Sequence, residues 1–213
     1  MADLVVGPDG RSRCGWGVTT PDYLAYHDHE WGRPVTSDRV LLEKLCLEGF
    51  QAGLSWLTIL RKRAAFREVF ADFDAEIVAS YDESDVRRLL DDARIIRHKG
   101  KIEASITNAR AMLGLRAQGG TLAELVWGHR PSSTTPPQTL AALPAVTAES
   151  TALARDLKAH GFRFVGPTTA YAAMQAMGVV NDHLDGCWVR EACGSARTEV
   201  IRGLGDQTQR GQC

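Results

Sequence analysis

Two pairs of metal-ligating residues lie near opposite ends of the sequence. Cys14 and His27 are separated by twelve residues, and His183 and Cys187 are separated by three. Two thiolates and two imidazoles bind zinc tetrahedrally, and four protein ligands leave no open position for a substrate. We therefore expect one structural zinc ion per chain, which joins the N-terminal and C-terminal segments.

The spacing within each pair leaves other ligands open. Cys193 is an alternative to Cys187, and His29 is an alternative to His27. The chain has five cysteines, an odd number, and its first ten residues do not resemble a signal peptide. We expect a cytoplasmic protein, in which neighbouring Cys and His residues indicate a metal site more often than a disulfide. A buried cysteine beside unrelated histidines is the simpler alternative.

A single carboxylate lies in an apolar stretch between two segments with helical periodicity. Residues 47–56 read Leu-Glu-Gly-Phe-Gln-Ala-Gly-Leu-Ser-Trp, which places Glu48 shortly before Trp56. A carboxylate beside a flat aromatic face suits a positively charged ring, through hydrogen bonds and cation–π attraction. Tyr23 and Tyr26 add two further aromatic faces. The alternatives are a helix-to-helix corner whose glutamate faces water, and tyrosines that pack in the core.

A short connection between two predicted helices is the third candidate site. Residues 161–169 read Gly-Phe-Arg-Phe-Val-Gly-Pro-Thr-Thr, which predicts a tight hairpin at Gly166 followed by a helix that begins near Thr168. Backbone amides at such a position bind phosphate, and Arg163 adds a charged donor. The basic stretch 95–101 is a second candidate phosphate contact. The alternatives are an ordinary helix connection and a solvated basic turn.

These candidate residues depend on helices for their positions. Apolar residues at helical spacing and N-capping residues predict the helices. Their expected ranges are 38–48, 55–70, 74–80, 84–91, 99–116, 121–127, 147–160 and 168–177. No pair of strands is expected, and the predicted fold class is all-α. We expect residues 1–12 to form a loose leader, 13–190 a single domain and 191–213 a disordered tail.

Composition limits the classes of protein that fit. The 213 residues are 44% hydrophobic and 24% charged, which suits one globular domain with a sizeable core. The net charge of -1 means that no overall field attracts the protein to nucleic acid, although basic residues cluster locally. No run of about 18 apolar residues is present, so we expect no membrane span.

Several short strings together resemble one enzyme family, and they cover most of residues 14–187. They are Arg13-Cys14-Gly15-Trp16, Tyr26-His27-Asp28 with Glu30-Trp31-Gly32, Cys46-Leu47-Glu48-Gly49, Gln51-Ala52-Gly53-Leu54-Ser55-Trp56, Ile95-Ile96-Arg97-His98 with Gly100-Lys101-Ile102, Gly161-Phe162 with Phe164-Val165-Gly166, and Val180-Asn181-Asp182-His183. With these strings the chain resembles the bacterial 3-methyladenine DNA glycosylase I family of the helix-hairpin-helix superfamily. The leader, the loop 128–144 and the tail lie outside the resemblance.

The resemblance implies an all-α helix-hairpin-helix fold with a zinc-binding region. The family's zinc ligands fall on Cys14, His27, His183 and Cys187. Its base-recognition glutamate falls on Glu48, which we take as the catalytic residue, and its stacking aromatics fall on Tyr26 and Trp56, with Tyr23 in support. Its DNA-backbone contacts fall on Arg163, Phe164, Gly166 and Thr168.

Three positions bear on how closely the chain follows this family and its superfamily. Asn181 occupies the place where many relatives in the wider superfamily carry a catalytic aspartate, as is usual for this family. Phe50 and Pro167 stand inside matched strings where polar residues are expected, which affects the polarity of the pocket and the contacts of the hairpin.

The resemblance also implies an activity and its partners. The protein is expected to act as a monomer on double-stranded DNA that carries 3-methyladenine. It would flip the damaged nucleotide, hydrolyse the N-glycosidic bond and leave an abasic site with free 3-methyladenine as product. Two alternatives stay open: a non-catalytic binder of alkylated or abasic DNA, and a zinc hydrolase that acts on a small molecule. The second needs an open coordination position, which four protein ligands argue against.

Overall fold

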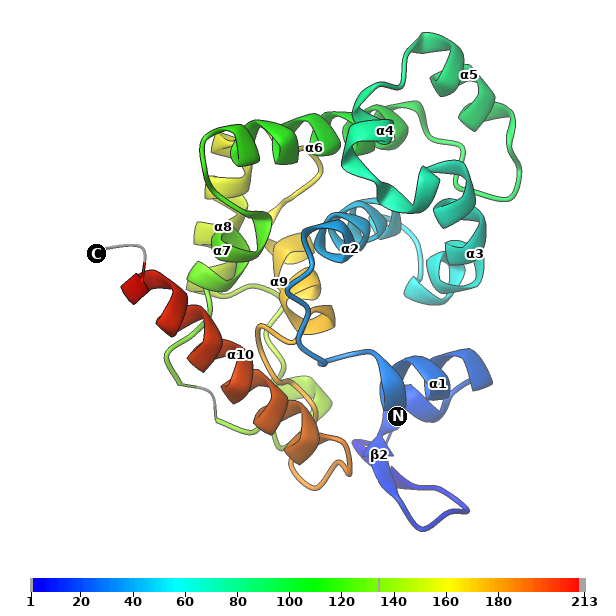
Figure 1. The fold of residues 1–213 in the computed structure, drawn as a ribbon. Helices are drawn as coiled ribbons and strands as arrows, with labels where there is room; N and C mark the ends of the chain where they lie inside the picture. Colours follow the sequence, from blue (N-terminus) through cyan, green and yellow to red (C-terminus); the bar gives the residue numbers. More distant parts are fainter. Residues whose placement is uncertain (1, 134, 211–213) are drawn as a thin grey trace. The chain divides into compact units, whose positions relative to one another are not determined.

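The computed structural model describes residues 2–133 and 135–210 (Figure 1). The chain divides into two compact units. Unit 1 comprises Met1–Thr36, Arg130–Ala145 and Met174–Cys213, and unit 2 comprises Ser37–His129 and Val146–Ala173. The sequence predicted a single domain over residues 13–190. The two ends of the chain therefore belong to one unit and its middle to the other.

Unit 2 is built from helices around α2 (Asp38–Gln51). Helix α2 packs against α3 (Trp56–Val69), α6 (Lys99–Ala117) and α7 (Leu122–Gly128). Helices α4 (Ala75–Ala79) and α5 (Glu83–Asp91) pack against α6, and α8 (Ala148–Ala159) packs against α7. The 3-10 helix η2 (Ala71–Phe73) follows α3. All ten residues from Leu41 to Phe50 are buried, so α2 forms the centre of this unit.

The predicted helices of unit 2 are confirmed within a few residues at each end. Side-chain caps set several of the starts: Ser55 accepts a hydrogen bond from the amide of Thr58, and Thr147 accepts one from Ser150. Helix α6 ends at a glycine pair, because Gly119 adopts φ +83° and the amide of Gly120 bonds back to the Leu115 carbonyl. Helix α9 (Pro167–Ala176) begins in unit 2 and ends in unit 1.

Unit 1 begins with a small hairpin that the sequence did not predict. Strand β1 (Leu4–Val6) pairs antiparallel with β2 (Ser12–Cys14), with Leu4 opposite Cys14. The expectations of a loose leader and of no strand pair were therefore wrong. Each strand has only three residues, which is too short for an alternating pattern to be read. The 3-10 helix η1 (Gly15–Val18) and helix α1 (Pro21–His29) follow.

The C-terminal segment differs most from expectation. Residues from Glu191 were predicted to be disordered, whereas the structure forms α10 (Arg190–Arg210). Cys193 of α10 is 1% exposed, and Arg197 donates hydrogen bonds to the carbonyls of Val179 (2.8 Å) and Pro131 (3.2 Å). These contacts order a helix whose sequence is mostly polar. Residues 211–213, which include Cys213, lie outside the described residues.

The loop between α7 and α8 contains the 3-10 helix η3 (Leu140–Ala142). Its backbone is fixed within unit 1, since the Leu140 amide donates to Asp3 (2.6 Å) and the Pro137 carbonyl accepts from the Asp185 amide (2.9 Å). Among the described residues, no helix has the length and apolar composition needed to cross a membrane.

Candidate metal centre and buried carboxylate

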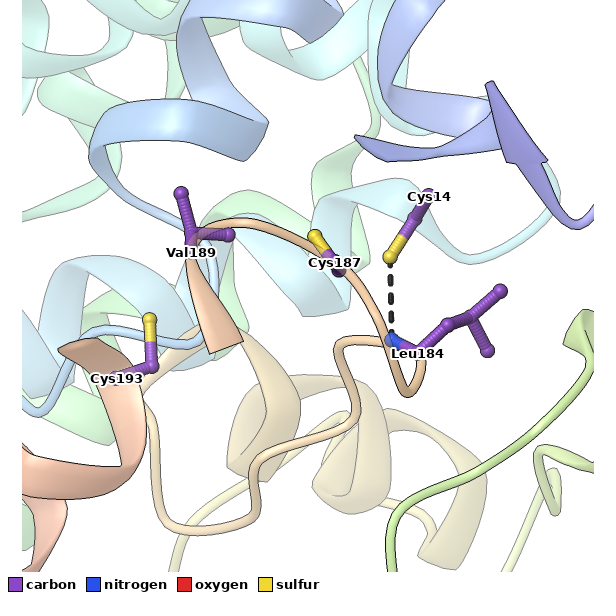
Figure 2. Close-up of a cluster of buried hydrophobic side chains, with 5 residues drawn as sticks. All are labelled: Cys14, Leu184, Cys187, Val189 and Cys193. Carbon is purple, nitrogen blue, oxygen red and sulfur yellow. Dashed lines mark hydrogen bonds between the residues drawn. The ribbon is translucent and has the colours of Figure 1, made fainter. Parts of the chain in front are cut away.

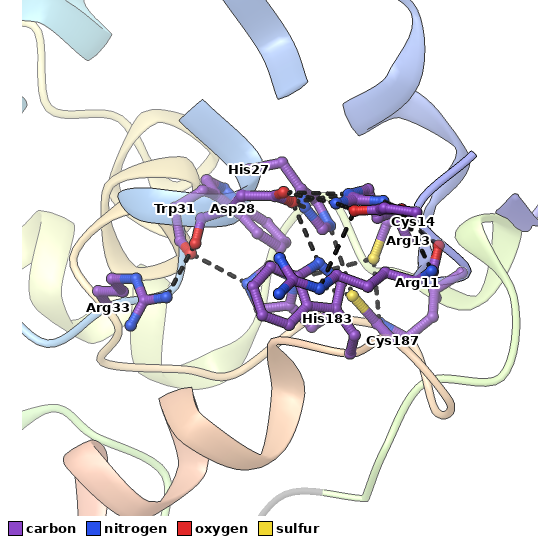
Figure 3. A network of polar contacts seen from close by, with 12 residues as sticks. Arg11, Arg13, Cys14, His27, Asp28, Trp31, Arg33, His183 and Cys187 are labelled. Atoms are coloured by element: carbon purple, nitrogen blue, oxygen red, sulfur yellow. Dashed lines mark hydrogen bonds and ion pairs between the residues drawn. The ribbon is translucent and has the colours of Figure 1, made fainter. Parts of the chain in front are cut away.

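The four predicted metal ligands converge in unit 1 (Figure 3). Cys14 ends β2, His27 lies in the last turn of α1, and His183 and Cys187 lie in the loop before α10. One ligand atom from each residue lies within 4.8 Å of the other three, and all four side chains are buried. The predicted set of ligands is therefore confirmed as a cluster that could hold a metal ion.

Three of the distances between these atoms match those around a tetrahedral ion. The Cys187 sulfur lies 3.4 Å from His27 Nε2 and 3.6 Å from His183 Nδ1, and the Cys14 sulfur lies 3.8 Å from the same Nδ1. With metal–sulfur bonds of about 2.3 Å and metal–nitrogen bonds of about 2.0–2.1 Å, tetrahedral zinc separates its ligand atoms by roughly 3.3–3.8 Å. The donor set and its spacing both suit such an ion.

Hydrogen bonds fix the nitrogen that each histidine directs at this cluster. His27 Nδ1 donates to the Asp28 carboxylate at 2.8 Å, and His183 Nε2 donates to the Trp31 carbonyl at 3.0 Å. Because each bonded nitrogen carries the proton, His27 Nε2 and His183 Nδ1 keep lone pairs directed at the sulfurs. Each imidazole is therefore oriented with one ring nitrogen towards the sulfurs.

Asp28 is held in turn by a second group of donors. Arg13 donates from Nε (3.0 Å) and Nη2 (2.9 Å), and Trp188 Nε1 donates at 3.2 Å. Although burial acts to raise it, these hydrogen bonds and the one from His27 keep the pKa of Asp28 below its usual value. The carboxylate is ionised at neutral pH and orients His27.

The two ligand sulfurs behave as a pair. A hydrogen bond between the thiols raises the pKa of Cys14 and lowers that of Cys187, and the Leu184 amide also donates to the Cys14 sulfur at 3.3 Å. Around them lies a buried apolar cluster that includes Leu184, Val189 and Cys193 (Figure 2). Apolar packing of this kind excludes water from a metal site.

The structure decides between the alternative ligands. Cys193 belongs to the apolar cluster and is absent from the ligand group found among the described residues, and His29 is exposed. Cys187 and His27 therefore occupy the ligand positions. Strand β2 is held beside the loop before α10, because the Trp188 amide donates to the Ser12 carbonyl (2.9 Å) and the Leu184 amide to the Cys14 sulfur (3.3 Å).

Glu48 of unit 2 is a buried carboxylate of a different kind. It lies one turn before the end of α2 and is 6% exposed. Among the described residues, none donates a hydrogen bond to its carboxylate. Burial raises its pKa to about 8, although the charge of Lys44 acts in the opposite direction. Glu48 is therefore mostly protonated at neutral pH unless a positive group approaches it.

The aromatic residues predicted to contact a base lie in both units. Trp56 is the first residue of α3 in unit 2, five residues beyond the end of α2. Tyr23 and Tyr26 lie on α1 in unit 1, where the Trp16 ring packs against both, with centroids 5.7 Å and 6.4 Å away. Tyr26 is 5% exposed and Tyr23 is half-buried. Their roles in base binding stay predictions.

The predicted hairpin between α8 and α9 lies in unit 2. Its helix begins at Pro167, one residue before the expected start, and the Gly166 carbonyl accepts the first helical hydrogen bond from Ala170 (2.8 Å). Proline suits this first position because its missing amide would have no helical partner. Arg163 and Thr168 are exposed, as a contact to a DNA backbone requires.

Phe164 occupies an unusual place at the tip of the hairpin. Its φ of +56° is in the left-handed region, which is uncommon for a residue with a side chain. A Cβ atom added at Gly49 would lie 3.3 Å from the Phe164 Cβ, so the hairpin packs closely against α2 at this glycine. The Phe164 ring also contacts His98 edge-on, with centroids 6.3 Å apart. The hairpin tip therefore adjoins the residue that follows Glu48.

Two positioning residues in unit 2 were missed by sequence reasoning. The buried side chain of Asn108 in α6 accepts a hydrogen bond from the Arg163 amide (2.7 Å) and donates one to the Arg163 carbonyl (3.2 Å). These two bonds fix the start of the hairpin. Lys101 was assigned to a basic turn that contacts phosphate, but its ammonium group points into the protein and bonds to carbonyls of Phe50 and Ala52. Asn108 belongs to none of the strings singled out in the sequence, and Lys101 lies in one that suggested a phosphate contact and not a bond to backbone carbonyls.

Comparisons with known proteins agree with this arrangement. The model of the methyladenine glycosylase family matches residues 16–191. DNA-3-methyladenine glycosylase 1 of Escherichia coli (strain K12) is 51% identical over 178 residues, which are 82% of this chain and 95% of the relative. A crystal structure of a 3-methyladenine DNA glycosylase I has a TM-score of 0.80 at 49% identity, and the match covers 83% of this chain and 98% of that one.

A second solved relative concerns the ligand directly. It is 3-methyladenine DNA glycosylase I from Staphylococcus aureus, whose structure was described as the structural basis of 3-methyladenine recognition. It is 35% identical, with a TM-score of 0.79, and the match covers 84% of this chain and 96% of the relative. The family match, the extent of both chains covered and the shared fold show that this chain belongs to the methyladenine glycosylase family of DNA repair enzymes.

Proposed function

We propose that this protein hydrolyses the N-glycosidic bond of 3-methyladenine in double-stranded DNA and leaves an abasic site. The observation that carries the proposal is Glu48, a buried carboxylate without a hydrogen-bond donor. A positively charged ring is the kind of ligand that such a group stabilises. A relative from the same family is known for recognising 3-methyladenine, which supports this choice of base.

The reaction needs little acid catalysis. Methylation at N3 gives the base a positive charge, so the base departs as a neutral ring when the bond between C1′ and N9 breaks. A water molecule adds to C1′, and its proton passes to solvent. Asn181, at the position of the superfamily's aspartate, supplies no carboxylate, and its side-chain nitrogen donates to the Arg190 carbonyl at 2.9 Å. This arrangement agrees with a reaction that has no strong general base at that position.

In this proposal the role of Glu48 is to distinguish the damaged base. The nucleotide must leave the stack, which costs a few kcal/mol and is cheaper for a damaged base. When the cationic ring arrives, its charge favours the ionised form of Glu48, which accepts a hydrogen bond from the ring's amino group. Such charge-assisted hydrogen bonds contribute about 1.5–3 kcal/mol. Normal adenine is neutral and would leave the carboxylate without this compensation.

The DNA backbone would be held by the hairpin of unit 2. The first amides of α9, at Thr168 and Thr169, have no helical acceptor, and helix N-termini bind phosphate well. Arg163 adds a positive charge nearby on the exposed side of the hairpin. Leu54, which is 42% exposed in the turn between Glu48 and Trp56, is an apolar side chain of the kind that inserts between bases.

We also propose that the metal in unit 1 is a structural zinc ion. Its ligands would be Cys14, His27, His183 and Cys187, and all four positions would be occupied by protein. When bound, the ion supplies folding energy by joining β2, α1 and the loop before α10. The orientation of both histidines and the buried sulfurs supports this assignment.

The test is mass-spectrometric identification of the bases released from methylated duplex DNA. The wild-type protein is expected to release 3-methyladenine, and Glu48→Gln is expected to lose at least about tenfold of the rate, from the loss of one charge-assisted hydrogen bond. Glu43→Gln is the matched control, because Glu43 is also buried on α2 but is paired with Arg67 at 2.8 Å. It should retain activity.

Two outcomes would contradict the proposal. If folded wild-type protein binds methylated or abasic duplex DNA but releases no base, the non-catalytic binder becomes the better description. If Glu48→Gln releases 3-methyladenine at the wild-type rate, Glu48 has no part in recognising the base.

A further inference from the structure

Lys101 has a buried side chain whose ammonium group is bonded to backbone carbonyls. It lies in the first turn of α6 and is 8% exposed. Its Nζ donates to the Phe50 carbonyl at 2.9 Å and to the Ala52 carbonyl at 2.6 Å. These carbonyls belong to the end of α2 and to the residue that follows it. Lys101 is therefore bonded to the segment that connects Glu48 to Trp56.

The segment contains a type II turn over residues 51–54. Ala52 has φ −48° and ψ 116°, Gly53 has φ +83°, and the Leu54 amide bonds to the Gln51 carbonyl at 2.6 Å. Type I and type II turns differ in the direction of the central peptide, whose carbonyl here is that of Ala52. Gly53 permits the type II form, and the hydrogen bond from Lys101 to this carbonyl stabilises it.

Lys101 also completes the end of α2. The Gly49 carbonyl accepts from the Ala52 amide at 3.4 Å, and the Gln51 carbonyl accepts from Leu54. Lys101 supplies the donors for Phe50 and Ala52, so each carbonyl from residue 49 to residue 52 has a partner. A positive charge at a helix C-terminus is also favoured by the helix dipole.

The turn determines how α3 begins. Ser55 directly follows the turn and caps α3, since its hydroxyl accepts from the Thr58 amide at 3.2 Å. Trp56 is the next residue, and Glu48 lies in the last turn of α2 before the turn. A change of turn type would redirect the start of α3 relative to the end of α2. The hydrogen bonds of Lys101 therefore control the relative placement of Glu48 and Trp56.

We infer that Lys101 is a positioning residue for base recognition, which acts through the α2–α3 turn and not through DNA phosphate. This inference rests on the proposed function, in which Glu48 and Trp56 contact the base. Lys101 itself touches neither the substrate nor the reacting atoms.

The test compares Lys101→Met with two lysine controls. Lys62→Met removes a comparable pair of lysine-to-carbonyl hydrogen bonds elsewhere in unit 2, because Lys62 donates to the carbonyls of Ala93 (3.0 Å) and Arg94 (2.9 Å). Lys99→Met removes an exposed lysine from the first turn of α6, where Lys99 pairs with Glu103 at 3.7 Å. Each variant is measured for affinity to free 3-methyladenine, for excision, and for the salt dependence of binding to an abasic duplex.

Lys101→Met is expected to lower both 3-methyladenine affinity and kcat/KM by about tenfold to 100-fold, because small misplacements of binding groups have effects of this size. Its affinity for the abasic duplex and the slope of that affinity against salt should stay at wild-type values. Lys62→Met and Lys99→Met should bind 3-methyladenine like the wild type. A wild-type 3-methyladenine affinity for Lys101→Met would overturn the inference. A salt slope reduced by about 1 would make Lys101 a phosphate contact instead.

A second measurement covers the case in which Lys101→Met does not fold. Reductive methylation of the folded wild-type protein, followed by peptide mass spectrometry, should label Lys101 much more slowly than Lys99. Equal labelling would contradict the buried hydrogen bonds. Wild-type excision is measured first, so a protein that releases no base would refute the proposed function, whereas the labelling result would still test the placement of Lys101.

Discussion

The metal cluster of unit 1 and Glu48 of unit 2 both bury ionisable groups, but only the first provides them with partners. Asp28 receives hydrogen bonds from Arg13, His27 and Trp188, and they hold its pKa below the usual value. Glu48 receives none from the described residues, and burial raises its pKa to about 8. A satisfied network stabilises one arrangement of the fold, whereas a buried carboxyl group with a raised pKa stabilises a positively charged ligand that favours its ionised form.

The largest expected effect is the loss of a metal ligand. Cys187→Ala should lower the free energy of unfolding by more than about 4 kcal/mol, since structural zinc contributes on the order of 10 kcal/mol in small metal-binding modules. Chelation of the wild-type protein should have a similar effect. Thermal unfolding and elemental analysis measure both. Cys193→Ala is the control, because Cys193 is equally buried but is not a ligand, and it should cost roughly 1 kcal/mol. A zinc-free wild-type protein of unchanged stability would contradict the structural role.

The second effect is a pH dependence of stability that comes from the burial of Glu48. Its folded pKa of about 8 exceeds its ordinary value of 4.5, so the folded state keeps a proton that the unfolded state releases between these values. The contribution of Glu48 to stability is therefore complete below about pH 4.5 and is lost as pH rises towards 8. Glu48→Gln should remove this loss and be more stable than wild type at pH 8, by a few kcal/mol.

Urea unfolding of both proteins at several pH values measures this difference. The stability gap between Glu48→Gln and wild type should widen from pH 5 to pH 8 and then stay constant. Glu43→Gln is again the control, because its carboxylate has a partner in Arg67. A gap that does not change with pH would show that Glu48 is solvated or already paired.

The smallest of the three effects is on metal affinity, through the carboxylate that bonds to a metal ligand. Asp28→Asn should weaken metal affinity by about tenfold to 100-fold, because the carboxylate orients His27 and increases its basicity. Competition with a coloured chelator measures the affinity. Asp9→Asn is matched to it, since Asp9 also bonds to Arg13 (2.6 Å) but does not contact a ligand. Equal affinities for the two variants would mean that Arg13, and not the carboxylate beside His27, sets the strength of the site.

Sequence patterns were sufficient to predict features that neighbouring residues determine, such as the starts of helices. Helix starts follow from capping residues such as Thr121, which forms a capping box with Glu124. The residue types of the metal ligands pointed to a metal site, but their spacing left Cys193 and His29 as alternatives, and only the family resemblance named all four ligands. The choice of Cys187 over Cys193 needed the spatial position of the loop before α10, which the sequence pattern alone does not give.

The remaining features depend on contacts distant in sequence. Helix α10 is ordered through Arg197, whose acceptors are the carbonyls of Val179 and Pro131. Asn108 and Lys101 bond to backbone groups about fifty residues away, and nothing in their local sequence separates them from surface residues. The raised pKa of Glu48 likewise results from burial among residues that the sequence pattern alone does not place around it.

Titration of the Glu48 carboxyl group tests the account most directly. The carboxyl carbon of each glutamate is followed by NMR against pH in ¹³C-labelled protein, and the Glu48 signal is assigned by its absence from Glu48→Gln. The account predicts one glutamate that titrates near pH 8 in the DNA-free protein and at a lower pH when the protein binds a duplex that carries a cationic, non-hydrolysable analogue of the 3-methyladenine nucleotide. A Glu48 signal that titrates near 4.5 in the free protein would contradict it, because the carboxylate would then already have the partners that the cationic base is proposed to supply.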